Sequence, residues 1–88
     1  MIIVAKSAIE QLNILKDIPE KEKLTTVVLA NPWVSTDYHC NKVIYDKNME
    51  QIMNFVNSCL PYDTEEHRVK VARTIFNDKA KEFGWKPF

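Results

Sequence analysis

Glycine is almost absent from this sequence, which has only Gly84 among its 88 residues. Loops that cradle phosphates need glycine, because backbone N–H groups must approach the phosphate without a Cβ atom in the way. The sequence accordingly contains no P-loop, no GxGxxG turn and no GxSxG nucleophile elbow. These absences exclude most nucleotide-driven enzymes and the α/β-hydrolases. The chain is also too short for a doubly wound cofactor domain, so we expect no cofactor.

Long apolar runs and an excess of charge of one sign are missing too. The longest apolar runs, Met1–Ala5 and Val27–Ala30, are far too short to cross a bilayer. The first run also lacks the basic segment and the cleavage site of a signal peptide. The 12 Lys and Arg residues balance 12 Asp and Glu residues, and the hydrophobic content of 45% is typical of a folded domain. We expect a single domain over residues 1–88, no membrane contact and a cytoplasmic location.

Residues suited to nucleophilic or metal chemistry are few. They are two cysteines, Cys40 and Cys59, and two histidines, His39 and His67. Their spacing matches no Cys–His dyad and no zinc signature such as C-x2-C, H-x3-H or HExxH. The simpler interpretation is two buried, free thiols in a reducing compartment and two surface histidines, with a Cys40–Cys59 disulfide as the alternative. We therefore expect no catalytic residues, no metal site and no enzymatic activity.

The start of the chain predicts a strand followed by a helix. Met1–Ala5 is a short apolar run typical of a buried strand. Ser7 and Glu10 form the Ser-x-x-Glu pattern of a capping box, which predicts a helix over residues 8–18. A single helix over residues 2–18 is the alternative. The expected apolar face of the 8–18 helix consists of Ala8, Leu12, Leu15 and Ile18.

The middle of the chain favours two strands. Leu24–Ala30 is rich in β-branched residues and apolar on both faces, as in a central strand. Tyr38–Tyr45 is a second β-favouring run with an apolar end. Between them lies an irregular loop that carries Trp33.

The end of the chain predicts two helices. Asn48 is expected to cap a helix over residues 49–60. The last and longest helix is expected to begin after Asp63 or Thr64 and to end at Gly84, which supplies a left-handed residue. Together the elements predict an α+β fold with a small two- or three-stranded sheet packed on one face by three helices. The expected order is β-α-β-β-α-α, or α-β-β-α-α if the chain begins with a helix.

The predicted 49–60 helix has an unusually uncharged polar face. Apart from Glu50, this face consists of Gln51, Asn54, Asn57 and Ser58. Solvated helix faces usually carry several charges, whereas the centres of protein interfaces are depleted of charge. We therefore expect this face to contact a partner protein or a second copy of the chain. A short, solvated helix in an Asn-rich sequence is the alternative.

Two aromatic residues near the predicted loop are further candidates. Trp33 and Tyr38 belong to the residue types that dominate binding hot spots, because they bury large areas at low entropic cost. The same residue types also complete small cores, which is the alternative for Trp33.

The last helix carries a basic stripe on the side opposite its apolar face. The stripe consists of Lys70, Arg73, Asn77 and Lys81, without an acid among them. Such a stripe suits the phosphates of a nucleic acid or an acidic protein surface. An ordinary solvated face is the alternative, and the zero net charge of the chain favours it.

These features predict a small non-enzymatic protein-interaction module, an inhibitor or adaptor that binds and blocks another protein, with self-association as an additional expectation. Short, compact, Lys/Ile/Asn-rich chains are typical of phages and mobile elements, whose products often block host defence complexes. This association suggests an anti-defence protein, although no particular residue carries it. The alternative is a nucleic-acid or nucleotide-binding module, in which the basic stripe contacts phosphates and Trp33 or Tyr38 stacks on a base.

Overall fold

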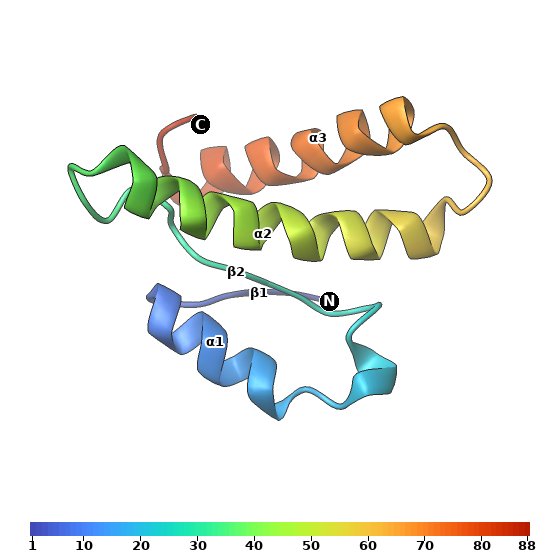
Figure 1. Ribbon diagram of the computed structural model, residues 1–88, viewed down its shortest axis with the longest axis horizontal. Helices are drawn as coiled ribbons and strands as arrows, with labels where there is room; N and C mark the ends of the chain where they lie inside the picture. The colour runs from blue at the N-terminus through green and yellow to red at the C-terminus, as the bar shows by residue number, and fades with distance from the viewer.

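Two short parallel strands lie between one helix and a pair of helices. The computed structural model describes all residues 1–88 (Figure 1). Its elements are β1 (Ile2–Val4), α1 (Ala8–Asp17), a single 3-10 turn η1 (Glu20–Glu22), β2 (Val27–Leu29), α2 (Tyr38–Cys59) and α3 (Glu65–Phe83). The α+β class, with a two-stranded sheet and three helices, is confirmed. The helices do not share one face: Figure 1 shows α1 on one side of the strands and the α2–α3 pair on the other.

The first strand and the first helix form where the sequence predicts them, so the single-helix alternative is wrong. The Ser7 hydroxyl caps α1 by accepting a hydrogen bond from the backbone N–H of Glu10 at 3.1 Å. The Glu10 carboxylate accepts from the backbone N–H of Lys6 at 3.4 Å, one residue earlier than in a standard capping box. The Ser7 hydroxyl, the first half of the predicted capping box, therefore sets the start of α1.

The sheet consists of β1 and β2 in parallel, with Ile2 opposite Val27 and Val4 opposite Leu29. Parallel strands cannot be joined by a tight turn, and α1 provides the crossover between them. β2 is shorter than the predicted 24–30 strand, but all three of its residues are buried. It is therefore the central element of the fold.

The predicted strand over residues 38–45 is wrong, because these residues form the first two turns of α2. Asp37 begins this helix by accepting a hydrogen bond from the backbone N–H of His39 at 2.9 Å. Asn48, the predicted N-cap, instead lies in the middle of α2 and is buried. The element order is therefore β-α-β-α-α, and α2, with 22 residues, is longer than α3, with 19.

The ends of α3 match the prediction closely. Thr64 caps its start, because its hydroxyl accepts from the backbone N–H of His67 at 3.2 Å. Gly84 ends the helix in the left-handed region with φ 73°, and the backbone N–H of Trp85 donates to the Ala80 carbonyl at 2.8 Å. The apolar face of the helix is buried or half-buried except at Phe83 near its end; its residues are Val69, Ala72, Ile75, Phe76, Ala80 and Phe83.

The hydrophobic core lies between β2 and the α2–α3 pair. Val27 and Leu29 supply the strand side of this core. The helix side consists of Ile52, Val56, Ala72, Phe76 and Ala80. Each of these residues is almost completely removed from water.

Two amide side chains of α2 pair with the second edge of β2. Since Val27 and Leu29 hydrogen-bond to β1, the backbone groups of Val28 and Ala30 point the other way. There the Gln51 amide both accepts from the Val28 N–H and donates to the Val28 carbonyl, each at 2.7 Å. The Asn48 amide accepts from the Ala30 N–H at 3.0 Å and donates to the Ala30 carbonyl at 2.7 Å. These side chains satisfy the strand edge as a third strand would.

A third buried amide joins α1 to this arrangement. The Nε2 group of Gln11 donates to the Val28 carbonyl and to the Asn48 Oδ1 atom, each at 2.8 Å. Gln11, Asn48 and Gln51 therefore form one hydrogen-bonded group, which we call the amide cluster. A separate buried amide, Asn41, donates to the Ser35 carbonyl at 2.9 Å and so fixes the loop before α2.

Removal of one member of the amide cluster should destabilise the fold strongly. The substitution Asn48→Ala leaves the buried N–H and C=O of Ala30 without partners, and we expect it to lower the free energy of unfolding by about 3 kcal/mol. The exposed Asn54 of the same helix is the matched control, and Asn54→Ala should change the value by less than about 0.5 kcal/mol. Urea denaturation measures both effects. A similar small loss for the two variants would contradict a structural role of the cluster.

Candidate functional site

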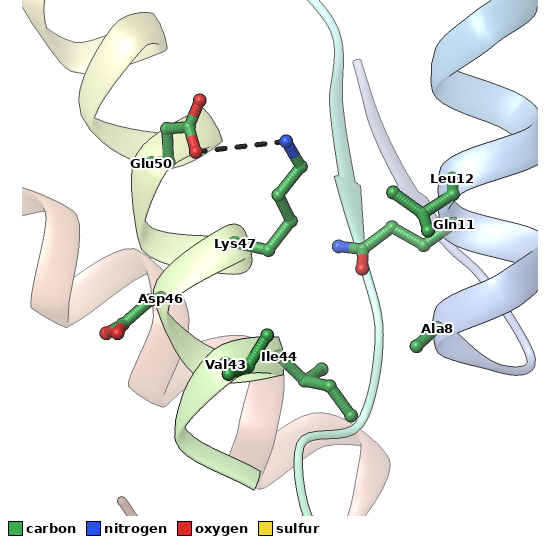
Figure 2. Close-up of a pocket in the computed structure, with 8 residues that line it drawn as sticks. All are labelled: Ala8, Gln11, Leu12, Val43, Ile44, Asp46, Lys47 and Glu50. Atoms are coloured by element: carbon green, nitrogen blue, oxygen red, sulfur yellow. Dashed lines mark ion pairs between the residues drawn. The ribbon is translucent and has the colours of Figure 1, made fainter. Parts of the chain in front are cut away.

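An apolar groove with a volume of about 410 Å³ lies between α1 and α2. Figure 2 shows Leu12 of α1 facing Val43 and Ile44 of α2 across it, with Gln11 between them. The remaining lining residues are Ala8, Asp46, Lys47 and Glu50. Gln11 is the member of the amide cluster that lines the groove, and apolar and charged side chains of the two helices form the rest of its lining.

Two of the apolar side chains that line the groove are exposed to water. Leu12 is 49% exposed and Val43 69%. The exposure of Leu12 corrects the prediction that it belongs to the core-facing side of α1. The inward position is taken by Gln11, which the backbone of β2 and Asn48 require as a hydrogen-bond donor. Leu12, one residue further along, is then turned toward the groove.

The charged groups at the groove are engaged with one another and not with its interior. Lys47 forms an ion pair with Glu50 at 3.8 Å, which Figure 2 marks at one end of the groove. Lys42 pairs with Asp46, and this hydrogen bond raises the pKa of the Lys42 ammonium. The Oε1 atom of Gln11, which accepts no hydrogen bond within the chain, is the free polar group that Gln11 brings to the groove.

The predicted uncharged face of the middle helix divides into two parts. Gln51 is only 9% exposed and hydrogen-bonds to Val28, so the prediction that it contacts a partner is wrong. The reason is that α2 lies against the edge of β2, which needs an amide at this position. Asn54, Asn57 and Ser58 are exposed, as predicted. Asn54 also lines a smaller hollow of about 180 Å³ that shares Lys47 and Glu50 with the groove.

Trp33 and Tyr38 lie in an aromatic cluster with the end of the chain. The Phe88 ring lies 4.9 Å from that of Trp33, 5.5 Å from that of Tyr38 and 4.4 Å from that of Tyr45, measured between centroids. The indole N–H of Trp33 donates to the Lys86 carbonyl at 2.9 Å. Trp33 is half-buried and holds the C-terminal segment in place, whereas Tyr38 remains mostly exposed.

The basic stripe of α3 is exposed along its whole length. Lys70, Arg73 and Lys81 take part in no ion pair, and Asn77 lies between them in water. The surface around the stripe is less basic than the residues of the stripe alone indicate. Glu65 and Glu66, in the first turn of α3, line one shallow hollow together with Lys70 and Arg73. Acidic side chains therefore accompany the cations at the start of the stripe.

The cysteines and histidines are spread over the surface. Cys40 and Cys59 are both free and exposed, so the prediction of buried thiols is wrong. They lie near opposite ends of α2, about 28 Å apart along the helix axis, which is too far for the alternative disulfide. No group of three or more His, Cys, Asp or Glu side chains is arranged to hold a metal ion. None of the helices combines the length and the apolar character needed to cross a membrane.

No protein-family model, curated protein or solved structure matches this chain. Its function is therefore inferred from its own surfaces, among which the groove between α1 and α2 is lined by exposed apolar side chains of two helices.

The hydrogen bond between Asp63 and His67 should make the free energy of unfolding vary with pH in the acid range. The His67 ring and the backbone N–H of Thr64 hydrogen-bond to the Asp63 carboxylate and lower its pKa below the usual value. A carboxylate whose pKa is lowered by folding stabilises the folded state above its unfolded pKa of about 4, and loses this effect as pH falls through the lowered value. Asp63→Asn should therefore be less stable than the wild type at pH 7, and the difference should shrink below about pH 4. Urea midpoints across this range measure it.

The control for this prediction is Asp78→Asn, at an exposed α3 carboxylate that forms no ion pair. A pH profile of Asp63→Asn that runs parallel to the wild type at all pH values would contradict the assignment.

Proposed function

We propose that this protein is a non-enzymatic interaction module that binds another protein through the groove between α1 and α2. The observation that carries the proposal is that two exposed apolar side chains, Leu12 of α1 and Val43 of α2, line that groove together with Ala8 and Ile44. Exposed apolar side chains gathered at one place, with a polar surround, are typical of protein-binding surfaces. Single exposed apolar residues elsewhere on the chain, such as Tyr62, carry no such argument.

The shape of the groove favours a protein segment over a small molecule. Binding sites for small molecules direct several polar groups at the ligand. Here the charged side chains pair with each other, and only the Gln11 Oε1 atom is free. A second, smaller hollow that shares Lys47 and Glu50 with the groove extends toward Asn54, so the two hollows follow one another along α2. An amphipathic helix or an extended segment that places apolar side chains between Leu12 and Val43 fits this outline.

The proposal extends to the biological role expected from the sequence. A small folded module that binds a partner through such a groove would act by occupying a site on that partner, as an inhibitor or an adaptor does. We place this activity in the cytoplasm, where the exposed thiols of Cys40 and Cys59 would stay reduced. An anti-defence role, which the Lys/Ile/Asn-rich composition suggests, is one form of such inhibition.

The groove is tested by substitution at its exposed walls. We expect the double variant Leu12→Glu, Val43→Glu to weaken partner binding by at least about 10-fold, because it puts charge into an apolar contact. Tagged full-length protein is used as bait in its natural host at moderate salt, and bound proteins are identified by mass spectrometry. Affinity for the identified partner is then measured by calorimetry.

The matched control is Tyr62→Glu, which adds the same charge at a fully exposed residue outside the groove. A partner that binds the wild type and this control but not the groove variant supports the proposal. A stoichiometric partner that binds all three proteins equally would show that the contact lies elsewhere, with Asn54, Asn57 and Ser58 as the next surface to test.

The exposed basic stripe supports a second candidate function, binding of nucleic acid. Lys70, Arg73 and Lys81 have no ion-pair partner within the chain and are free to contact phosphates. This function predicts binding to a labelled oligonucleotide that weakens steeply between about 50 and 200 mM salt. Reversal of the three charges to Glu should abolish the binding. An affinity that is unchanged by the reversal, or by salt, would remove the stripe from consideration.

A further inference from the structure

The outer edge of β1 has no partner. In the parallel pair, Met1, Ile3 and Ala5 of the first segment hydrogen-bond to Val27 and Leu29. Because successive residues of a strand point their backbone groups to opposite edges, the N–H and C=O groups of Ile2 and Val4 face away from β2. No side chain or backbone group of the chain hydrogen-bonds to them.

This open edge differs sharply from the second edge of β2. There the amide cluster satisfies the outward N–H and C=O of Val28 and Ala30. β1 also lacks the usual protections of an edge strand, since residues 1–5 contain no charged side chain and no proline. Instead, the Met1 and Ile2 side chains are exposed, Ile2 to 39%.

We propose that the β1 edge pairs with the β1 edge of a second copy of this chain, in antiparallel orientation with the two-fold axis at Ile3. In this register Ile2 of each copy lies opposite Val4 of the other, and both residues exchange N–H···O bonds in both directions. Ile3 lies opposite its own counterpart as a non-hydrogen-bonded pair. This is the two-fold register in which the outward groups of Ile2 and Val4 meet each other. The product is a continuous sheet in the order β2-β1-β1-β2.

A second copy fits this edge better than a partner of different chemistry. Identical strands paired antiparallel place like residues near each other, which is unfavourable for charged strands but favourable for the apolar run of residues 1–5. The chain has zero formal net charge, so two copies do not repel each other overall. A sheet of two three-residue strands is also at the lower limit of stable size, and pairing doubles it. The interface uses no residue that lines the groove between α1 and α2.

Sedimentation velocity of the full-length protein over a range of concentrations tests the pairing. We expect a concentration-dependent species of twice the 10.3 kDa chain mass. Val4→Pro removes an outward N–H without removing a bond to β2, and Ile2→Lys places a charge on the edge; both should give monomers with unchanged circular dichroism. Leu24→Lys is the control, since Leu24 is a comparably exposed apolar residue outside the strands, and it should remain dimeric.

A cysteine test fixes the register and does not depend on the proline variant folding. In a Cys40→Ser, Cys59→Ser background, Ile3→Cys should form an intermolecular disulfide under mild oxidation, because the two residues meet at the two-fold axis. Val4→Cys, which faces Ile2 of the other copy, should not. A wild-type protein that stays monomeric at all concentrations, dimers that persist in Ile2→Lys, or cross-linking through position 4 but not 3 would each overturn the proposal.

Discussion

The structure depends on how the second edge of β2 is satisfied. A buried strand presents N–H and C=O groups on both sides, and leaving them without partners in the interior is costly. β1 pairs with one side, and on the other Gln51 and Asn48 of α2 take the place of a strand. Because each amide pairs with one particular residue, Val28 or Ala30, the arrangement fixes the position of α2 along β2 as well as its rotation. The hydrophobic core of α2 and α3 is then built on that placement.

The same constraint produces the groove. Gln11 must point inward from α1 to reach Val28 and Asn48, and this orientation turns its neighbour Leu12 outward. On α2, Val43, Lys47, Glu50 and Asn54 repeat with helical spacing and form the side of the helix next to the inward amides. The candidate binding surface is thus a consequence of polar pairing in the interior, and a change in the amide cluster would alter the surface as well as the stability.

Local signals in the sequence predicted the boundaries of helices better than the identity of every segment. Ser7, Thr64 and Gly84 each act within one helical turn, so their roles could be predicted without knowledge of the fold. Residues 38–45 were expected to form a strand because of their β-favouring side chains. They are helical because the packing of α2 against β2 outweighs this local preference. The amides at Asn48 and Gln51 were visible in the sequence. A buried amide that pairs with a strand edge and an amide at an interface have the same uncharged, polar character, and only the position of β2 distinguishes them.

The two edges of the small sheet therefore differ: one is hydrogen-bonded within the chain and the other is open. Each edge lies at a different surface of the molecule. The β2 edge is closed internally by side chains, and the groove forms above that closure, between α1 and α2. No group of the chain hydrogen-bonds to the outer edge of β1, which lies on the other side of the sheet from α2. A second copy paired at β1 would leave both grooves of the dimer open. A partner that carries two linked binding segments would occupy both grooves of such a dimer and bind far more tightly than either contact alone allows.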